Sequence, residues 1–188
     1  MNKRKIVLDV DDVLGEFTRS LNKFYNERYG TNFRFEDYSV YDLTKIWGRD
    51  SKEVRRIIFD FYSHPSLTEI KPLEFSQNVL QMLNASGENE FIACSYRIGW
   101  IECETKNWIR ENFFDMKTRC IGYKSKSKLD LCKEEDANFI VEDNLQTVIE
   151  CTKAGITAIL ISRPWNQRVP NDGFYRAKNW RNVLDYLK

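Results

Sequence analysis

The sequence has few of the features that thiol catalysis requires beside a cysteine. It contains one histidine, His64, and no Cys-x-x-Cys motif among its five cysteines, which are Cys94, Cys103, Cys120, Cys132 and Cys151. A catalytic thiol needs a base close to it, and His64 lies far from these cysteines in the sequence. Most of the cysteines fall in apolar strand or helix patterns, so we expect reduced, buried thiols of a cytoplasmic protein.

The chain also lacks an excess of charge, a long apolar run and internal repeats. Lys and Arg number 29 against 28 for Asp and Glu, a formal net charge of +1. This balance gives no reason to expect binding to a nucleic acid polymer or to a membrane. The apolar stretch after residues 1–5 is too short for a signal peptide or a membrane span. A length of 188 residues suits one domain, or a core with a small insertion.

Carboxylates, in contrast, are concentrated near the start of the chain. Ile6–Leu8 indicate a buried parallel strand, and Asp9, Asp11 and Asp12 follow it. Ligands bind at this end of the strands in open α/β sheets. Three carboxylates this close repel one another unless a cation lies among them, and oxygen ligands suit Mg²⁺. A solvated acidic turn is the alternative, and these residues alone do not decide between the two.

Three later segments place a polar side chain at the edge of an expected element. Ser95 ends an apolar strand, Lys128 begins a helix and Asp143 ends another apolar strand. Each feature is common by itself, but their order after the first carboxylates is informative. Helices and strands alternate from residue 73 onward, which predicts parallel strands with right-handed crossovers. The expected strands span residues 91–94, 118–121, 139–141 and 156–161, and the helices 75–83, 100–113, 128–135, 147–154 and 180–187.

Together the four motifs resemble those of the haloacid-dehalogenase-like (HAD) phosphohydrolases, from Ile6 to about Trp180. Within that superfamily the chain is most similar to the cytosolic 5′(3′)-deoxyribonucleotidase-like family. The second resemblance rests on residues 13–17 before an amphipathic helix, on Ser95-Tyr96-Arg97, on Arg163-Pro164-Trp165-Asn166 and on Asn179-Trp180. It implies an α/β fold with a Rossmann-like parallel sheet flanked by helices.

Residues 16–72 interrupt the alternation of helix and strand. They contain helical patterns at Phe17–Tyr29 and Lys52–Tyr62 and no clear strand. The segment resembles the small helical cap that the superfamily inserts after the first strand. We therefore expect a core of residues 1–15 and 73–188 and a cap of residues 16–72. The alternative is a peripheral helical pair that only pads the sheet.

The resemblance implies a Mg²⁺-dependent phosphomonoesterase that works through an aspartyl-phosphate. Asp9 matches the nucleophile, and Asp11 matches the general acid and base, whose backbone carbonyl also binds the metal. Asp143 completes the metal ligands and is favoured over its neighbour Glu142 because it is the last acidic group at the strand end.

Four further residues are expected at the phosphate or the substrate: Ser95, Tyr96, Arg97 and Lys128. Ser95 and Lys128 would contact phosphoryl oxygens, whereas Arg97 would hold a phosphate or base oxygen. The alternatives are a strand-ending cap for Ser95, a helix cap for Arg97 and a solvated loop for Lys128. Lys126 is the second candidate for the phosphate lysine.

The chain departs from the family pattern at three positions. Asp12 stands where the family usually has Gly, Ser95 where Thr is commoner, and Glu142 where Asp is usual. None of these changes removes an essential functional group, so activity is expected, but they weaken the inference about the substrate.

Aromatic residues make up 14% of the chain. The expected cap and its flanks carry Phe17, Phe33, Phe35, Tyr38, Tyr41 and Trp47. Most must form a core, and one or two could stack on a nucleobase. The favoured substrate is therefore a small phosphate monoester, a (deoxy)ribonucleoside monophosphate. The alternatives are a HAD phosphatase for a sugar phosphate and a catalytically silent HAD-fold binding module. A homodimer is compatible with the sequence.

Overall fold

The computed structural model describes residues 3–63, 69–97, 101–122, 126–167 and 173–188. Within these ranges the strands are β1 (Arg4–Asp9), β2 (Asn89–Ser95), β3 (Lys117–Cys120), β4 (Phe139–Glu142), β5 (Thr157–Ile161) and β6 (Tyr175–Ala177). They form one parallel sheet in the order β3-β2-β1-β4-β5-β6. Ile6 of β1 pairs with Phe91 of β2 on one side and with Phe139 of β4 on the other. The predicted α/β fold with a parallel sheet is confirmed.

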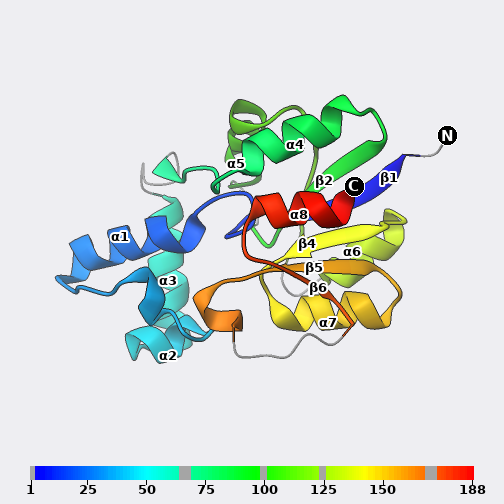
Figure 1. Ribbon diagram of the computed structural model, residues 1–188. Helices are drawn as coiled ribbons and strands as arrows, with labels where there is room; N and C mark the ends of the chain where they lie inside the picture. Colours follow the sequence, from blue (N-terminus) through cyan, green and yellow to red (C-terminus); the bar gives the residue numbers. More distant parts are fainter. Residues whose placement is uncertain (1–2, 64–68, 98–100, 123–125, 168–172) are drawn as a thin grey trace.

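Helices cover both faces of this sheet. Ile6 and Leu8 belong to one hydrophobic cluster and Val7 to another, because successive side chains of a strand point to opposite faces. One face carries α4 (Ser76–Ala85), α5 (Ile101–Asn112) and α8 (Trp180–Leu187), and the other carries α6 (Lys128–Glu134) and α7 (Leu145–Lys153) (Figure 1). Burial on both faces explains the unbroken apolar run in β1. None of the described helices is long and apolar enough to cross a membrane.

Residues 16–72, called the insert below, leave the sheet after β1. They contain α1 (Phe17–Tyr29), the 3₁₀ helix η1 (Phe35–Asp37), α2 (Leu43–Trp47) and α3 (Ser51–Tyr62). Figure 1 shows these helices beyond the C-terminal end of β1, away from the two helical layers. The sequence did not predict α2, because five residues show no periodicity. Its limits are local: Asp42 accepts a hydrogen bond from the Thr44 N–H, and Gly48 ends the helix with φ of 62°.

The insert has an aromatic core of its own. The rings of Tyr25 and Trp47 stack at 4.1 Å with an interplanar angle of 8°. Phe61 of α3 meets Phe24 of α1 edge to face, with ring centroids 5.6 Å apart. Such pairs contribute about 0.5–1.5 kcal/mol each beyond their burial. Of the six aromatic residues singled out in the sequence, Tyr38 and Trp47 are buried in the core, and Phe17 and Phe33 pack against it.

The two chain segments that join the insert to the sheet run side by side. The Glu16 N–H donates to the Lys71 carbonyl at 2.9 Å, and the Leu73 N–H donates to the Leu14 carbonyl at 2.7 Å. Paired backbone groups at this crossing avoid the cost of unsatisfied polar atoms. The first and last residues of the insert are thereby fixed next to each other.

Gly15 lies at this crossing. A Cβ atom there would approach Cγ2 of Ile70 to 2.8 Å and the Trp108 ring to 2.9 Å. Trp108 is itself held in place, because its indole N–H donates to the Ile70 carbonyl at 2.8 Å. Only glycine allows the insert and α5 to approach this closely.

Two local expectations differ from the structure. The short strand β6 was not predicted, because three residues give no pattern. Met82, one of the apolar residues of the helix expected at 75–83, is 59% exposed, whereas Val79, Leu80 and Leu83 of α4 are buried.

The cysteines largely follow the expectation of free thiols. Cys94, Cys132 and Cys151 are buried, Cys120 is half-buried and Cys103 is exposed, and none of these cysteines forms a disulfide. His64 and Trp100 lie outside the described residues.

Candidate active site

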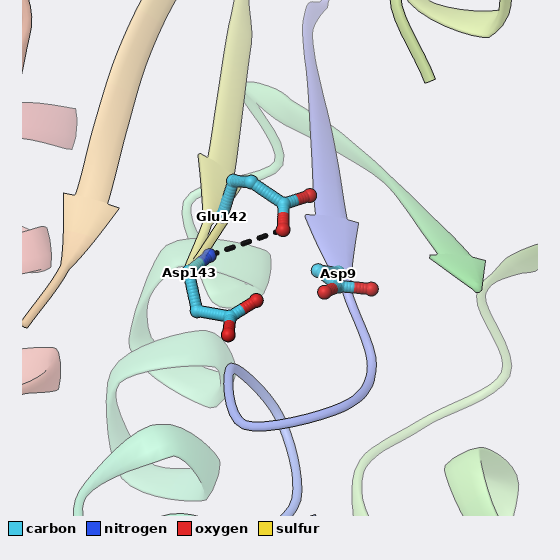
Figure 2. Close-up of side chains that lie close together, drawn as sticks. All are labelled: Asp9, Glu142 and Asp143. Carbon is cyan, nitrogen blue, oxygen red and sulfur yellow. Dashed lines mark hydrogen bonds between the residues drawn. The ribbon is translucent and has the colours of Figure 1, made fainter. Parts of the chain in front are cut away.

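Three carboxylates converge at the C-terminal edge of the sheet. Asp9 ends β1, Glu142 ends β4 and Asp143 follows it, and one oxygen from each lies within 4.8 Å of the others. Figure 2 shows the three side chains directed toward one another from the two strands. β1 and β4 are neighbours at the point where the strand order reverses, which is where open α/β sheets bind ligands. All three residues are at most 5% exposed.

Lys128 lies against this cluster and bridges two of its members. Its ammonium is 2.7 Å from Asp9 Oδ1 and 2.7 Å from Glu142 Oε2. Burial alone would lower the pKa of Lys128, but the two carboxylates raise it well above its usual value, so the ammonium stays charged. Lys126, the second candidate, instead pairs with Glu134. The structure therefore brings Lys128, and not Lys126, to the acidic cluster.

Sequence features explain why Lys128 reaches the cluster. Ser127 caps α6 by accepting from the Asp130 N–H, and the Asp130 side chain accepts from the Ser127 N–H in return. This capping box begins α6 at Lys128. Lys128 is thus the first residue of α6, and its side chain reaches the strand-end residues Asp9 and Glu142.

The cluster brings together carboxylates that disfavour one another's charged forms. Burial, and then the charge of Glu142, raises the pKa of both Asp9 and Asp143 well above the usual value. Although burial acts to raise the pKa of Glu142 as well, the adjacent Lys128 lowers it. Among the described residues, one ammonium pairs with this group of three carboxylates, whose oxygens suit a hard divalent cation. The residues present fit a metal ion, and Glu142 belongs to this group although the sequence favoured Asp143 over it.

The side chain of Asp11 is turned toward β2. Its carboxylate accepts hydrogen bonds from the Ser95 hydroxyl at 3.2 Å and from Arg97 Nε at 3.3 Å, and it forms an ion pair with the guanidinium of Arg97. Arg97 is 4% exposed and also donates to the Thr105 hydroxyl of α5. Ser95 and Arg97 are therefore close to the acidic cluster, but here they contact Asp11.

Asp12 has a structural role that the sequence did not reveal. Its φ of 59° is left-handed, a conformation that Gly adopts freely and Asp tolerates better than most residues. The carboxylate accepts hydrogen bonds from the Thr18 N–H at 3.1 and 3.2 Å, near the N-terminus of α1. Burial raises the pKa of Asp12 to about 6. The Asp-for-Gly departure therefore helps to secure the first helix of the insert.

A short segment after β5 supports both acidic loops. It contains the 3₁₀ helix η3 (Pro164–Asn166). The guanidinium of Arg163 donates to the Asp12 carbonyl at 2.8 and 2.6 Å. The Trp165 indole N–H donates to Asp143 Oδ2 at 2.9 Å, and the Asn166 amide donates to the Asp143 carbonyl at 2.8 Å. The sequence singled out these residues only through a family resemblance. Because they directly follow a strand of the same sheet, their place at the C-terminal edge could have been predicted.

Aromatic side chains of the insert reach the same edge. Phe35 and Tyr41 meet the Trp165 ring edge to face, with centroids 5.9 and 6.4 Å away. Desolvation, and then the charge of Asp143, raises the pKa of Tyr41 above its ordinary value, although 58% of the residue is exposed. Tyr38 and Trp47, in contrast, are buried in the insert.

Two tyrosines flank the cations of the site. The Tyr96 ring has the Lys128 ammonium 5.2 Å from its centroid, and the Tyr62 ring of α3 has the Arg97 guanidinium at 5.4 Å. Tyr96 was expected near the substrate, whereas Tyr62 was not singled out. Contacts of this kind stabilise a cation modestly, by about 0.5–2 kcal/mol. They place one ring from the core and one from the insert beside the site.

Comparison with known proteins identifies the family. A model of the family described as "5′ nucleotidase, deoxy (Pyrimidine), cytosolic type C protein" matches residues 3–188. The chain belongs to this family. A 5′ nucleotidase hydrolyses a phosphate monoester, so the chain is a member of a family of phosphatases, as its sequence motifs indicated.

Three named relatives share little sequence identity with this 5′-nucleotidase family member. "Putative nucleotidase BH1399" of Halalkalibacterium halodurans is 23% identical over 188 residues, which cover 98% of this chain and 93% of the relative. Among solved structures, the haloacid dehalogenase-like hydrolase SP0104 from Streptococcus pneumoniae superposes with a TM-score of 0.72 at 12% identity, over 99% of each chain. The L-2-haloacid dehalogenase PA0810 gives 0.60 at 14% identity over 100% of both chains. At such identities the likeness shows the HAD fold alone, which serves different reactions.

Proposed function

We propose that the protein is a Mg²⁺-dependent phosphomonoesterase that uses Asp9 as its nucleophile and acts on deoxyribonucleoside monophosphates. The observation that carries the proposal is the position of Asp9, whose carboxylate contacts the Lys128 ammonium and clusters with the carboxylates of Glu142 and Asp143. A phosphate dianion repels a carboxylate, so such a nucleophile needs positive charge on both sides. Lys128 supplies one side.

A divalent ion held by this cluster would supply the other side. Asp9, Asp143 and the Asp11 backbone carbonyl are its proposed ligands, and Glu142 keeps Lys128 in position. When bound, Mg²⁺ neutralises phosphoryl charge and orients the phosphate. The three strand-end carboxylates favour such an ion because their mutual repulsion falls when it binds.

Hydrolysis proceeds in two steps at Asp9. In the first, the Asp9 carboxylate attacks phosphorus, the bond to the leaving oxygen breaks and an aspartyl-phosphate forms. In the second, water attacks that phosphorus and the bond to Asp9 breaks, which releases inorganic phosphate. Lys128 and the Ser95 hydroxyl contact the phosphoryl oxygens in both steps and stabilise their charge.

Asp11 moves the protons. It donates a proton to the leaving oxygen in the first step and accepts one from the attacking water in the second. The Asp11 side chain is 24% exposed, against 6% for Asp9, so it is the carboxylate that a leaving group can reach. Arg97 and Ser95 orient it. Arg97 is thus proposed to lie close to the substrate and to act on the reaction by holding the Asp11 carboxylate in place.

The insert is proposed to be a cap of residues 16–72 over a core of residues 1–15 and 73–188. Its aromatic side chains at the site, Phe35 and Tyr41, offer faces for a nucleobase, and Tyr96 lies on the core side. A sugar phosphate would leave these faces unused, so the nucleotide is favoured over that alternative. The grouping of Asp9, Asp11, Ser95, Lys128 and Asp143 at one edge favours an enzyme over a silent binding module.

A substrate panel tests this proposal. We expect kcat/KM for deoxyuridine or thymidine monophosphate to exceed that for ribose 5-phosphate and glucose 6-phosphate, with activity lost on chelation by EDTA and restored by Mg²⁺. Asp9→Asn is the inactive control. Faster turnover of the sugar phosphates would refute the nucleotide substrate but keep the phosphatase chemistry. Unchanged turnover in EDTA would refute the metal-dependent mechanism.

A further inference from the structure

We propose that Trp165 is a positioning residue for the metal ligand Asp143 and that the insert holds Trp165 in place. This inference rests on the proposed metal-dependent function of the same site. It adds a physical link between the insert, which faces the substrate, and the carboxylate that binds the metal. No residue of the four sequence motifs provides this link.

The first step of the argument is the double attachment of Asp143. Its Oδ2 accepts from the Trp165 indole N–H at 2.9 Å, and its carbonyl accepts from the Asn166 amide at 2.8 Å. Asp143 is only 3% exposed. Both its side chain and its backbone are therefore tied to η3.

The chemistry of the indole suits this position. Tryptophan is a hydrogen-bond donor without charge, so it can orient one carboxylate oxygen of Asp143 without competing with a metal cation. Lys128 differs, because it brings a positive charge to Asp9. A metal ion would then be held through the other oxygen of Asp143, Oδ1. Groups that orient a ligand in this way typically change metal affinity about 10–100-fold when they are removed.

The second step is the packing of the Trp165 ring by the insert. Phe35 of η1 meets it at 5.9 Å with an interplanar angle of 75°, and Tyr41 meets it at 6.4 Å and 74°. These are the edge-to-face geometries that aromatic pairs prefer. The guanidinium of Arg19 in α1 lies 4.1 Å from the Phe35 ring centroid. A continuous set of contacts thus runs from the first helix of the insert to Asp143.

Direct titration with Mn²⁺ tests the first step, because the free ion is detected by electron paramagnetic resonance without any turnover. Trp165→Phe keeps a ring but removes the N–H donor. We expect its Kd for Mn²⁺ to rise about tenfold or more. Trp108→Phe is the matched control, because it loses an N–H that donates to a backbone carbonyl away from the cluster, at 2.8 Å. Its Kd should stay within about twofold. Circular dichroism confirms that each variant is folded.

Phe35→Leu tests the second step without touching the metal ligands or their hydrogen bonds. Loss of one aromatic contact should raise the Mn²⁺ Kd about two- to tenfold. Phe33→Leu is the control, since Phe33 contacts Tyr25 inside the insert instead. In a Trp165→Phe background the effect of Phe35→Leu should shrink, because the two changes act through one hydrogen bond.

The outcomes separate this inference from the proposed function. A folded Trp165→Phe variant that binds Mn²⁺ as the wild type does would overturn the role of Trp165. An effect of Phe35→Leu that is the same in both backgrounds would overturn the link to the insert. If the wild-type protein itself fails to bind Mn²⁺, the metal-dependent function falls, and this inference falls with it.

Discussion

The sheet edge and the insert contribute different kinds of groups to one site. At the sheet edge, Asp9, Lys128, Glu142 and Asp143 are charged, at most 5% exposed and fixed by the ends of strands or by the first residue of a helix. The insert contributes aromatic rings, and one of them, Tyr41, is 58% exposed. The buried charges suit chemistry common to every phosphate monoester, whereas the rings suit recognition of one ester among many. Changes at the edge should therefore affect all substrates alike, and changes in the insert should discriminate among them.

The largest effect is expected from Asp9→Asn. Without the proposed nucleophile, kcat should fall at least about 10⁴-fold for every substrate, as it does when other nucleophiles are removed. Folding should be retained, because the substitution removes one of three repelling carboxylates. Phosphate release from p-nitrophenyl phosphate and from a nucleotide measures the loss, and thermal unfolding measures stability. Residual turnover near the wild-type rate would show that the nucleophile is another group.

Lys128→Met comes next and tests the edge without removing a carboxylate. Loss of the ammonium leaves Asp9 and Glu142 buried without their partner, and breaking such a pair costs about 3–5 kcal/mol. We expect a lower free energy of unfolding in urea, together with a severe loss of activity on every substrate. Lys126→Met is the matched control, because it removes a lysine that pairs with Glu134. If the control is the inactive variant, the phosphate lysine is assigned wrongly.

Asp11→Asn should have an intermediate effect that depends on the leaving group. Loss of positioned proton transfer slows a reaction by about 10²–10⁴-fold, and an alkyl phosphate needs the proton more than p-nitrophenyl phosphate does. The rate on the alkyl phosphate, divided by the rate on p-nitrophenyl phosphate, should therefore fall in the variant. Equal losses on both substrates would assign Asp11 a structural role beside Arg97.

The smallest effect is expected in the insert and should be selective. Tyr41→Ala removes a partly exposed ring, and stacking on a base is worth about 1–3 kcal/mol. We expect kcat/KM to fall about 5- to 150-fold for nucleotides and to change little for p-nitrophenyl phosphate. Tyr175→Ala removes an exposed ring on β6 and serves as the control. A uniform loss on all substrates would remove the distinction between edge and insert.

The sheet edge was the more predictable of the two regions. A strand buried on both faces is an unbroken apolar run, so its end, and the carboxylates there, can be located from the sequence. The start of α6 was expected at Lys128, with Lys126 left as the second candidate for the phosphate lysine, and the structure shows that a local capping box of Ser127 and Asp130 fixes it. These signals lie within a few residues of the groups they locate, which is why the fold and the acidic cluster could be anticipated.

The remaining features depend on contacts that no local pattern encodes. Arg97 meets Asp11 across 86 positions of sequence, and Trp165 meets Asp143 across 22. The sequence likewise separated Asp143 from Glu142 by position alone, although both join the cluster. Helices as short as α2 begin and end at single capping residues and show no periodicity. The sequence therefore shows how many aromatic residues the insert has, but not which of them face the site. The roles of all these residues in catalysis stay predictions.

The backbone crossing at Gly15 has a consequence for how such enzymes diverge. Because Glu16 bonds to Lys71 and Leu73 bonds to Leu14, the insert begins and ends at adjacent points. A segment with neighbouring ends can be exchanged for another without moving the strands on either side. Recombination that replaces residues 16–72 would thus preserve the strand-end carboxylates while it changes the surface above them. New specificities can arise by transplanting the insert, with Gly15 kept because Trp108 of α5, outside the exchanged segment, packs against it.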